Sequence, residues 1–264
     1  MAKVTLENLN KIFVSKIGKD VKAVNDFNLL LEDGEILALL GSSGCGKTTT
    51  LRMIAGFETA TSGQIKIGER IVNDLKPADR NVAMAFEGYA LYPPLTVKDN
   101  IAFSLMREKI SKDKVDSKVM EVAELLEITD ILERYPPSIS GGQQQRVSLA
   151  RALVRDSDAL LLDEPMSQLE PQLRAVLRAR VKDYIQHNNK TVIFVTHDQT
   201  EAVALADKIA VMENGDLKQL ASPYEISAKP SNVFVASFIC LLYTYDAADD
   251  PWSVGLGGGR MSKK

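Results

Sequence analysis

The sequence predicts an α/β fold built around one mostly parallel sheet, and three observations lead to this prediction. Short apolar runs, which suit buried strands, alternate with segments whose apolar residues recur every three or four positions. A glycine-rich loop at residues 41–48 lies between a strand pattern and a helical pattern. With 264 residues, of which 45% are hydrophobic and 25% charged, the chain is long enough to bury a large core.

The strand predictions follow the chain in order. The opening reads as mostly strand, because its apolar runs are separated by turn signals such as Glu32-Asp33-Gly34-Glu35. Later runs are continuously apolar, as strands buried on both faces require, and several are separated by helical patterns. The predicted strands cover residues 4–6, 27–31, 36–40, 65–67, 82–86, 159–162, 192–195 and 209–212.

A helical block is expected between residues 93 and 157. Its apolar residues recur at spacings of three and four, namely Val97, Ile101 and Leu105, then Val115, Val119, Val122 and Leu126. Thr96, with Asp99 three residues later, resembles a capping pair at the start of the first helix. The sequence shows no internal repeat.

The glycine-rich loop has the spacing of a phosphate-binding P-loop. Its glycines let the backbone curl so that N–H groups converge on phosphate oxygens, and the next helix adds its positive dipole end. Lys47 would reach the outer phosphates, and the Thr48 hydroxyl would ligate Mg²⁺. A glycine-rich turn with an accidental lysine is the alternative, and the strand and helix context argues against it. The predicted nucleotide contacts here are Gly41, Ser42, Ser43, Gly44, Cys45, Gly46, Lys47, Thr48 and Thr49.

A second motif is an apolar run that ends in two acids, Leu160-Leu161-Leu162-Asp163-Glu164. A strand end beside a phosphate loop is where a carboxylate can hold Mg²⁺ through water. We predict that Asp163 assists the metal and that Glu164 polarises the attacking water as a general base. Two acids that merely solvate a strand end are the alternative, which would be preferred for an isolated pair.

The two histidines have different settings. His197 comes just after the apolar run 192–195, separated from it only by Thr196, so it could hydrogen-bond the γ-phosphate or the attacking water. A strand-end histidine bonded to local backbone is the alternative. His187 lies in the polar stretch Gln186-His187-Asn188-Asn189, and we expect it to be a surface loop residue.

Ser140-Gly141-Gly142-Gln143 precedes a helical pattern with an apolar stripe. The serine hydroxyl and the glycine N–H groups would crowd a helix N-terminus and form a second anion site. For this turn taken alone, an N-cap with a flexible glycine pair is the better interpretation.

Charge and cysteine content exclude several classes. A formal net charge of −3 gives no general attraction to nucleic acid or anionic lipid. The two cysteines, Cys45 and Cys240, exclude a disulfide-dense secreted scaffold and fit a reducing compartment. The start has no signal-peptide pattern and no apolar run reaches about 20 residues, so we expect a cytoplasmic protein.

Together, the motifs at 41–48, 140–143, 160–164 and 197 occur in the order and approximate spacing of ATP-binding cassette (ABC) ATPases. The chain resembles an ABC transporter nucleotide-binding subunit over residues 3–239. The segments 88–97 and 140–146 resemble ATPases of bacterial carbohydrate importers of the maltose and glycerol-phosphate type. This implies a P-loop NTPase (RecA-like) core at about 1–92 and 158–239, with an N-terminal antiparallel β subdomain and a helical subdomain at about 93–157.

The resemblance also implies partners and further contacts. Two cassettes would assemble head to tail, with each ATP between the P-loop of one and Ser140, Gly141, Gly142 and Gln143 of the other. Phe13 matches the position that stacks on adenine; an ordinary strand aromatic is the alternative. The helical subdomain would bind transmembrane permease subunits at the inner face of the cell membrane, and an extracytoplasmic solute-binding protein would act indirectly. No nucleic acid partner is expected.

Three residues depart from the family pattern. Glu87 stands where glutamine usually contacts Mg²⁺ and water; a carboxylate can still ligate Mg²⁺, but its charge lies near the γ-phosphate. Glu170 replaces an aspartate in the loop after Glu164, and Ile139 replaces a leucine. Because Lys47, Glu164 and His197 remain, we expect slow to normal ATP hydrolysis.

The end of the sequence departs further. Periodicity stops at about residue 241, and we expect residues 240–264 to be disordered or non-native, from a truncated or misassembled reading frame. The C-terminal regulatory β-domain usual in this importer type is expected to be absent.

Several functions remain open at this stage. The leading one is an ATPase that energises import of a sugar or related polyol. A second keeps the cassette but makes the transported solute a polyamine, an ion or another polar metabolite. Glu87 with Glu170 motivates a non-catalytic ATP-binding regulator. A non-transport cassette acting on ribosomes or DNA fits poorly with an acidic single cassette.

Overall fold

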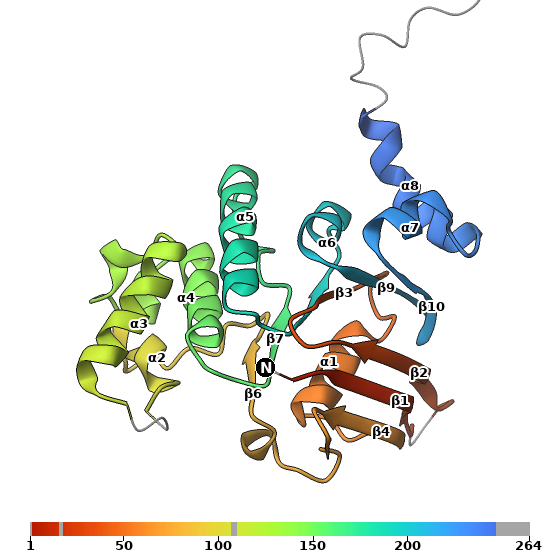
Figure 1. Ribbon diagram of the computed structural model, residues 1–264, viewed down its shortest axis with the longest axis horizontal. Coiled ribbons are helices and arrows are strands. Elements are labelled where there is room, and N and C mark those ends of the chain that lie inside the picture. Colours follow the sequence, from red (N-terminus) through yellow and green to blue (C-terminus); the bar gives the residue numbers. More distant parts are fainter. Residues whose placement is uncertain (1, 16–17, 107–109, 247–264) are drawn as a thin grey trace, which may run out of the picture.

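The computed structural model describes residues 2–15, 18–106 and 110–246, with side chains described as far as Ile239. Its strands form one ten-stranded sheet in the order β5-β4-β1-β2-β10-β9-β3-β8-β7-β6. Figure 1 shows the helices gathered on both sides of this sheet, with α2, α3 and α4 together beyond the β6 edge. The predicted α/β class is confirmed.

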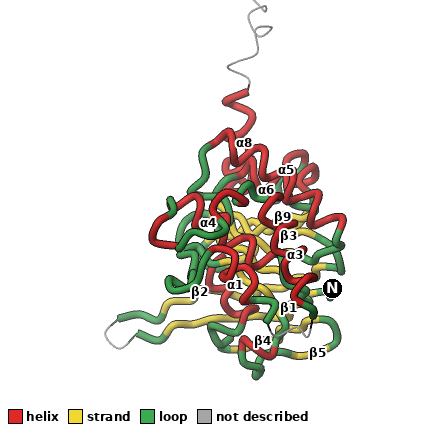
Figure 2. Tube along the Cα trace, turned by 90° about the vertical axis from the view of Figure 1, so that its left-hand side faces the viewer, coloured by secondary structure: helices red, strands yellow, loops and turns green. Residues whose placement is uncertain are grey.

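One end of the sheet is antiparallel. It consists of β1 (Val4–Phe13), β2 (Val21–Leu31), β4 (Ser62–Ile67) and β5 (Arg70–Ile71). β1 pairs antiparallel with both β2 and β4, and the register shifts along each pairing. Figure 2 shows β1, β4 and β5 at the bottom of the molecule, with the helices above.

The other end is parallel and carries the site. It consists of β3 (Ile36–Gly41), β8 (Val192–Thr196), β7 (Ala159–Asp163), β6 (Val82–Ala85) and β9 (Lys208–Glu213). β10 (Asp216–Ala221) pairs antiparallel with β9 and meets β2 at the single pair Asp216–Asn25. This pair joins the two ends into one sheet.

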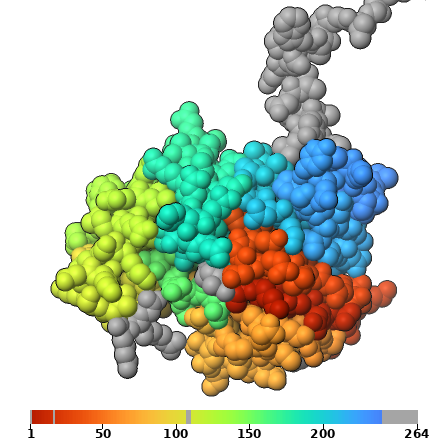
Figure 3. Space-filling model, viewed as in Figure 1, coloured from red at the N-terminus to blue at the C-terminus, as the bar shows by residue number. Residues whose placement is uncertain are grey.

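The helices connect and cover these strands. They are α1 (Lys47–Ala55), α2 (Val97–Phe103), α3 (Lys112–Leu125), α4 (Gly141–Leu153), α5 (Pro171–His187), α6 (Gln199–Leu205), α7 (Pro223–Ala228) and α8 (Val233–Asp246). Short 3-10 turns lie at Pro77–Asp79, Thr129–Ile131 and Pro136–Ser138. Figure 3 shows the helices between β6 and β7 on one flank and the C-terminal elements on the opposite flank.

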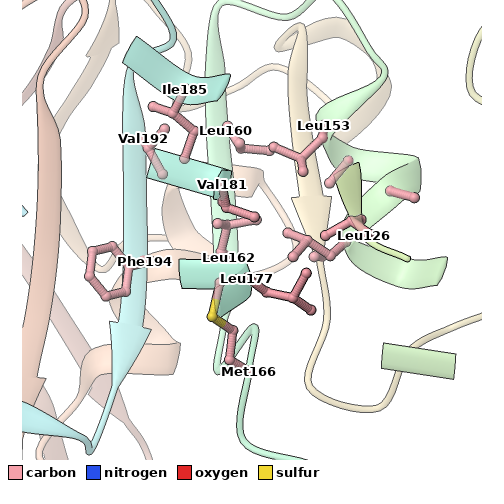
Figure 4. Packing of buried hydrophobic residues seen from close by; sticks show 14 of the residues in the cluster. Leu126, Leu153, Leu160, Leu162, Met166, Leu177, Val181, Ile185, Val192 and Phe194 are labelled. Atoms are coloured by element: carbon pink, nitrogen blue, oxygen red, sulfur yellow. The ribbon is translucent and has the colours of Figure 1, made fainter. Parts of the chain in front are cut away.

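The core has two parts, one on each face of the sheet, because successive strand residues point to opposite faces. Within β7, Leu160 and Leu162 join the cluster that includes α5, whereas Ala159 and Leu161 join the cluster that includes α1. Figure 4 shows α5 residues packed between β7, β8 and the residues of the helical block. Burial on both faces explains why these strands are continuously apolar.

The structure extends several sequence predictions and corrects one. Every predicted strand is present, although β1 and β2 are longer than expected and β6 ends at Ala85. Strands β5 and β10 and helix α7 were not predicted. The prediction that His187 lies in a loop is wrong: it is exposed, but it is the last residue of α5, whose C-cap is Asn188.

The predicted cap at the start of α2 is confirmed, because the Thr96 side chain accepts a hydrogen bond from the Asp99 N–H at 3.1 Å. At the other end of the chain, the backbone stays helical to Asp246, past the expected limit of order near residue 240. The rest of the tail, 247–264, lies outside the described residues. Among the described residues, no helix is long and apolar enough to cross a membrane.

Candidate active site

A cavity of about 380 Å³ lies where the carboxyl ends of β3, β7 and β8 meet the start of α1. In open parallel sheets, this edge is the usual place for a ligand. The residues that line the cavity come from five separate segments. They are Ala23, Ser43, Gly44, Gly46, Lys47, Thr48, Thr49, Glu87, Glu164 and His197.

The P-loop takes a shape that requires glycine at Gly46. This residue has φ 105°, and a Cβ built on it would lie 2.2 Å from the carbonyl oxygen of Ala23. β2 therefore passes directly against the loop. Gly44 also has a positive φ of 77°, but a Cβ there would meet nothing within 4 Å. The first turn of α1 contains no acidic residue, so its positive end is free to attract an anion.

Lys47 supplies a buried positive charge beside the cavity, with only 7% of its surface exposed. Its ammonium donates hydrogen bonds to the carbonyls of Gly41 at 2.8 Å and Ser42 at 2.9 Å, and it lies 3.7 Å from the Cys45 sulfur. Within the described part of the chain, no carboxylate forms an ion pair with it. An anionic ligand would therefore be attracted to it strongly in this low-dielectric setting.

Asp163 ends β7 next to the first turn of α1. The Thr48 hydroxyl donates a hydrogen bond to its Oδ1 at 3.1 Å. Burial raises the pKa of the Asp163 carboxyl, the Thr48 hydrogen bond opposes the rise, and the nearby charges of Glu87 and Glu164 add to it. A desolvated carboxylate among like charges favours a bound cation. Thr48, Asp163 and Glu87 offer only oxygen donors, the kind that Mg²⁺ prefers, so these residues fit that ion.

Glu164 has a strained backbone, with φ 49°. Hydrogen bonds hold it there: its N–H donates to the Val195 carbonyl at 3.0 Å, and its carbonyl accepts from the Gln145 side chain at 2.9 Å and from the Ser167 hydroxyl at 3.3 Å. Its Oε1 lies 3.2 Å from Nδ1 of His197. The two sequence-predicted catalytic residues thus meet on the wall of the same cavity.

Glu87 also lines the cavity, as an exposed residue just beyond the end of β6. It raises the pKa of Asp163 through its negative charge. The departure noted in the sequence therefore lies where it can affect the electrostatics of the site.

The turn at residues 140–143 lies elsewhere. Ser140 accepts a hydrogen bond from the Gln143 N–H and donates its own N–H to the Gln143 side chain, which is a capping box for α4. None of these four residues lines the cavity. Phe13 does not line it either; its ring is 41% exposed and lies 4.8 Å from the Lys11 ammonium.

Sequence reasoning missed two residues of this site. Ala23 lines the cavity because β2 crosses the P-loop, and an alanine in a strand carries no sequence signal for that role. Gln145, on α4, is 3% exposed and also accepts a hydrogen bond from the Gln168 N–H at 2.9 Å. It joins α4 to the loop that follows Glu164.

Comparison with known proteins agrees with this geometry. A profile of the family described as "ABC transporter" matches residues 24–167. The chain belongs to the ABC transporter family. Its match includes the P-loop, the turn at 140–143 and Glu164, but ends before His197.

Several named members of this family are similar to the chain. The trehalose/maltose import ATP-binding protein MalK of Thermococcus litoralis is 49% identical over 245 residues, which are 90% of this chain and 64% of that protein. The sn-glycerol-3-phosphate import ATP-binding protein UgpC of Brucella abortus (strain 2308) is 43% identical, over 97% of this chain and 72% of that protein. The chain thus spans about two thirds of the length of these relatives, and 63% of the xylose/arabinose import ATP-binding protein XacK of Haloferax volcanii.

A solved structure shares the fold. The dimeric ATP-binding cassette MJ0796, in a post-hydrolysis state bound to ADP and Pi, has a TM-score of 0.77 and 27% sequence identity. The likeness covers 83% of this chain and 98% of that one. This agreement confirms the predicted P-loop fold of the ABC cassettes.

Proposed function

We propose that this chain is the ATP-binding and ATP-hydrolysing subunit of an ABC importer. The observation that carries the proposal is the cavity in which the Lys47 ammonium, the free N-terminus of α1 and the Glu164–His197 pair meet. This arrangement can bind the phosphates of a nucleotide and activate a water beside them. The names of the similar proteins, all import ATP-binding proteins, point the same way.

The residues divide the chemistry between them. The P-loop N–H groups and Lys47 stabilise negative charge on the phosphates. Glu164 accepts a proton from the attacking water, and His197, 3.2 Å from it, orients the water or the γ-phosphate. Mg²⁺, held by Thr48, Asp163 and Glu87, would neutralise phosphate charge when bound.

A second copy of the chain, or a related cassette, would complete each ATP site. The capping box leaves the Ser140 hydroxyl able to donate to an anion, yet the 140–143 turn lies outside the cavity of its own chain. A head-to-tail partner could bring this turn over the P-loop. The dimeric state of the cassette MJ0796 supports this assembly. We propose that Phe13, on the exposed end of β1, contacts the adenine.

The proposals for the membrane partners and for the solute rest on the names of the similar proteins. The names of the similar proteins include import of trehalose, maltose, sn-glycerol-3-phosphate, xylose and arabinose. We propose a sugar or related polyol as the transported class, with permease subunits bound to the cassette at the inner face of the membrane. A solute-binding protein would deliver the solute to those subunits.

The test is ATP hydrolysis measured against protein concentration with Mg²⁺ present. A composite site predicts that specific activity rises as chains pair, and Glu164→Gln, the control, should bind ATP but lose at least about 100-fold in turnover. Activity that stays constant with concentration would contradict the composite site. Activity that survives in Glu164→Gln would contradict the assignment of the base.

Glu87 favours a second candidate, a cassette that binds ATP without turning it over. Its carboxylate adds negative charge to a cavity that Glu164 also lines, and Asp163, bonded to Thr48, lies beside that cavity. Glu87→Gln removes that charge and keeps the shape. If wild-type chain binds ATP but hydrolyses none, and Glu87→Gln restores hydrolysis, the regulator is the better function. Equal turnover in both proteins supports the ATPase.

A further inference from the structure

A second and smaller cavity lies behind the Glu164–His197 pair. Its volume is about 10 Å³, which is the size needed for one water molecule. Its walls come from β8, the start of α6, α5 and the loop after β7. The lining residues are Glu164, Ser167, Arg174, Thr196, His197, Asp198 and Glu201.

Arg174 ties together the two loops that carry the catalytic pair. From α5, its guanidinium donates to the carbonyls of Ser167 at 3.3 Å and Leu169 at 3.0 Å, in the loop that follows Glu164. It also pairs with Asp198, the residue after His197, at 3.3 Å. This one side chain therefore bonds to both of these loops.

Glu201 fixes the other side of the His197 loop. It is 3% exposed, and its Oε2 accepts a hydrogen bond of 2.5 Å from the Thr196 hydroxyl. The same hydroxyl accepts from the Asp198 N–H at 3.0 Å, and the Asp198 side chain caps the Glu201 N–H at 3.1 Å. His197 lies between Thr196 and Asp198, so this closed set of bonds restricts the backbone on both of its sides.

Two buried polar atoms of these residues have no partner among the described residues. They are Oε1 of Glu201 and Nε of Arg174, one an acceptor and one a donor. Both residues line the small cavity. Buried polar groups in native proteins are nearly always satisfied, by protein or by ordered water. A water molecule in this cavity could accept from Arg174 and donate to Glu201.

We infer that Arg174 and Glu201, bridged by one buried water, are positioning residues that hold His197 and Glu164 together for catalysis. The inference rests on the proposed ATPase function and concerns the geometry behind the site. Neither residue lines the cavity proposed to bind the nucleotide, so we expect neither to touch it. Their effect passes through the loops that carry the catalytic pair.

Steady-state kinetics tests the positioning role. Glu201→Met keeps the length of the side chain but removes both carboxylate oxygens. Arg174→Met keeps the apolar stem on α5 but removes the guanidinium. We expect kcat to fall about 10- to 100-fold in each, with KM for ATP within about threefold of wild type. Glu201→Gln keeps one acceptor for the Thr196 hydroxyl and places an N–H donor at the other position, to which the water can turn an oxygen lone pair. It should restore kcat to within about threefold of wild type.

A matched control comes from the same helix. Arg180, on α5, pairs with Glu127 at 2.8 Å on the protein surface and lines neither catalytic cavity. Arg180→Met should leave kcat unchanged. Wild-type kcat in Glu201→Met, or a fall in Arg180→Met equal to that in Arg174→Met, would overturn the inference. So would a Glu201→Gln variant as slow as Glu201→Met.

Crystal structures of wild type and Glu201→Met supply a measurement that does not need activity. We expect an ordered water within hydrogen-bond distance of Arg174 Nε and Glu201 Oε1 in wild type. In Glu201→Met, that water should be lost and His197 should move away from Glu164. An absent water in wild type, or an unmoved His197 in the variant, overturns the inference. If wild type binds ATP without hydrolysing it, the proposed function fails, while these structures still decide the inference.

Discussion

At the candidate site, the roles of single residues depend on how closely neighbouring backbone approaches them and on how deeply they are buried. Gly46 has a left-handed conformation and lies too close to β2 for a side chain, Asp163 is desolvated beside Thr48, and Glu164 has a strained backbone. These features lie at one edge of the sheet, where the proposed chemistry occurs. Strain of this kind persists only where the surrounding structure enforces it.

Gly46 and Gly44 form a matched pair for a first prediction. Both have positive φ, so alanine costs each about 1 kcal/mol of backbone strain. Only at Gly46 would the new Cβ meet a backbone oxygen, at 2.2 Å from Ala23. We expect Gly46→Ala to weaken ATP binding at least tenfold and to lower the melting temperature, as measured by titration calorimetry and thermal unfolding. Similar affinities for Gly46→Ala and Gly44→Ala would contradict this account.

A second prediction concerns the pH dependence of stability. Burial raises the pKa of Glu201 above its ordinary value of 4.5; the Thr196 hydrogen bond, Arg178 and Arg174 oppose the rise, and the charge of Asp198 adds to it. The folded state therefore binds this proton more tightly than the unfolded state. Wild type should lose stability relative to Glu201→Gln as pH rises through the raised pKa, by about 1.4 kcal/mol for each unit of pKa difference.

Urea unfolding of wild type and variant between about pH 3 and pH 8 measures this difference. Glu225 is a control of opposite sign, because its hydrogen bonds to Ser222 lower its pKa. Wild type should gain stability relative to Glu225→Gln above the ordinary pKa of that group and lose the gain as pH falls. A pH-independent difference for Glu201→Gln would show that the Glu201 pKa is not raised.

At the scale of elements, helix α4 connects two motifs of the proposed ATPase, the turn at residues 140–143 and the strand end at Glu164. Its N-terminus carries the Ser140 capping box, and one turn later Gln145 holds the carbonyl of Glu164. α7 begins with a capping box as well, formed by Ser222 and Glu225, far along the chain from any predicted site residue. Comparing the two caps therefore distinguishes the contribution of an N-cap to helix stability from a role in nucleotide binding.

The third prediction uses these two caps. Ser140→Ala and Ser222→Ala should each lower the free energy of unfolding by about 1 kcal/mol, because each removes an N-cap hydrogen bond. Only Ser140→Ala should also reduce ATP turnover at saturating protein, since its hydroxyl is the one proposed to contact the nucleotide of the partner cassette. Denaturant unfolding and an ATPase assay measure the two effects. Equal turnover in the two variants would exclude a binding role for Ser140.

At the scale of the whole molecule, one sheet with a core on each face joins all the elements. Leu160, in β7, is fully buried in the cluster that contains residues of the helical block and of α5 (Figure 4). The strands β3, β8 and β7 are thus fixed from both sides. Their carboxyl ends, which carry the candidate site, are held by this packing.

The fourth prediction follows from that shared core. Leu160→Ala should lower the free energy of unfolding by about 2–5 kcal/mol through lost burial and a residual cavity. Because the cluster spans the helices and the sheet, far-UV and near-UV circular dichroism should follow one transition at the same denaturant concentration. Two separated transitions would mean that the helical block unfolds independently of the sheet.

The sequence by itself determined the local features of this protein. The α/β class, the P-loop and the cap at Thr96 were predictable, because each depends on residue types at fixed short spacings or on the period of apolar residues. The family was also predictable from the order of its motifs. The predicted ends of the strands were less accurate. β1 and β2 extend into polar segments, where pairing with neighbouring strands supplies the hydrogen bonds.

Only the tertiary structure decided which distant residues meet. It brought Glu87, Glu164 and His197 into one cavity, added Ala23 through the path of β2, and kept the 140–143 turn outside. It also placed Arg174 and Glu201 behind the catalytic pair. These positions depend on packing between elements far apart in the chain, and local spacing carries no information about that packing.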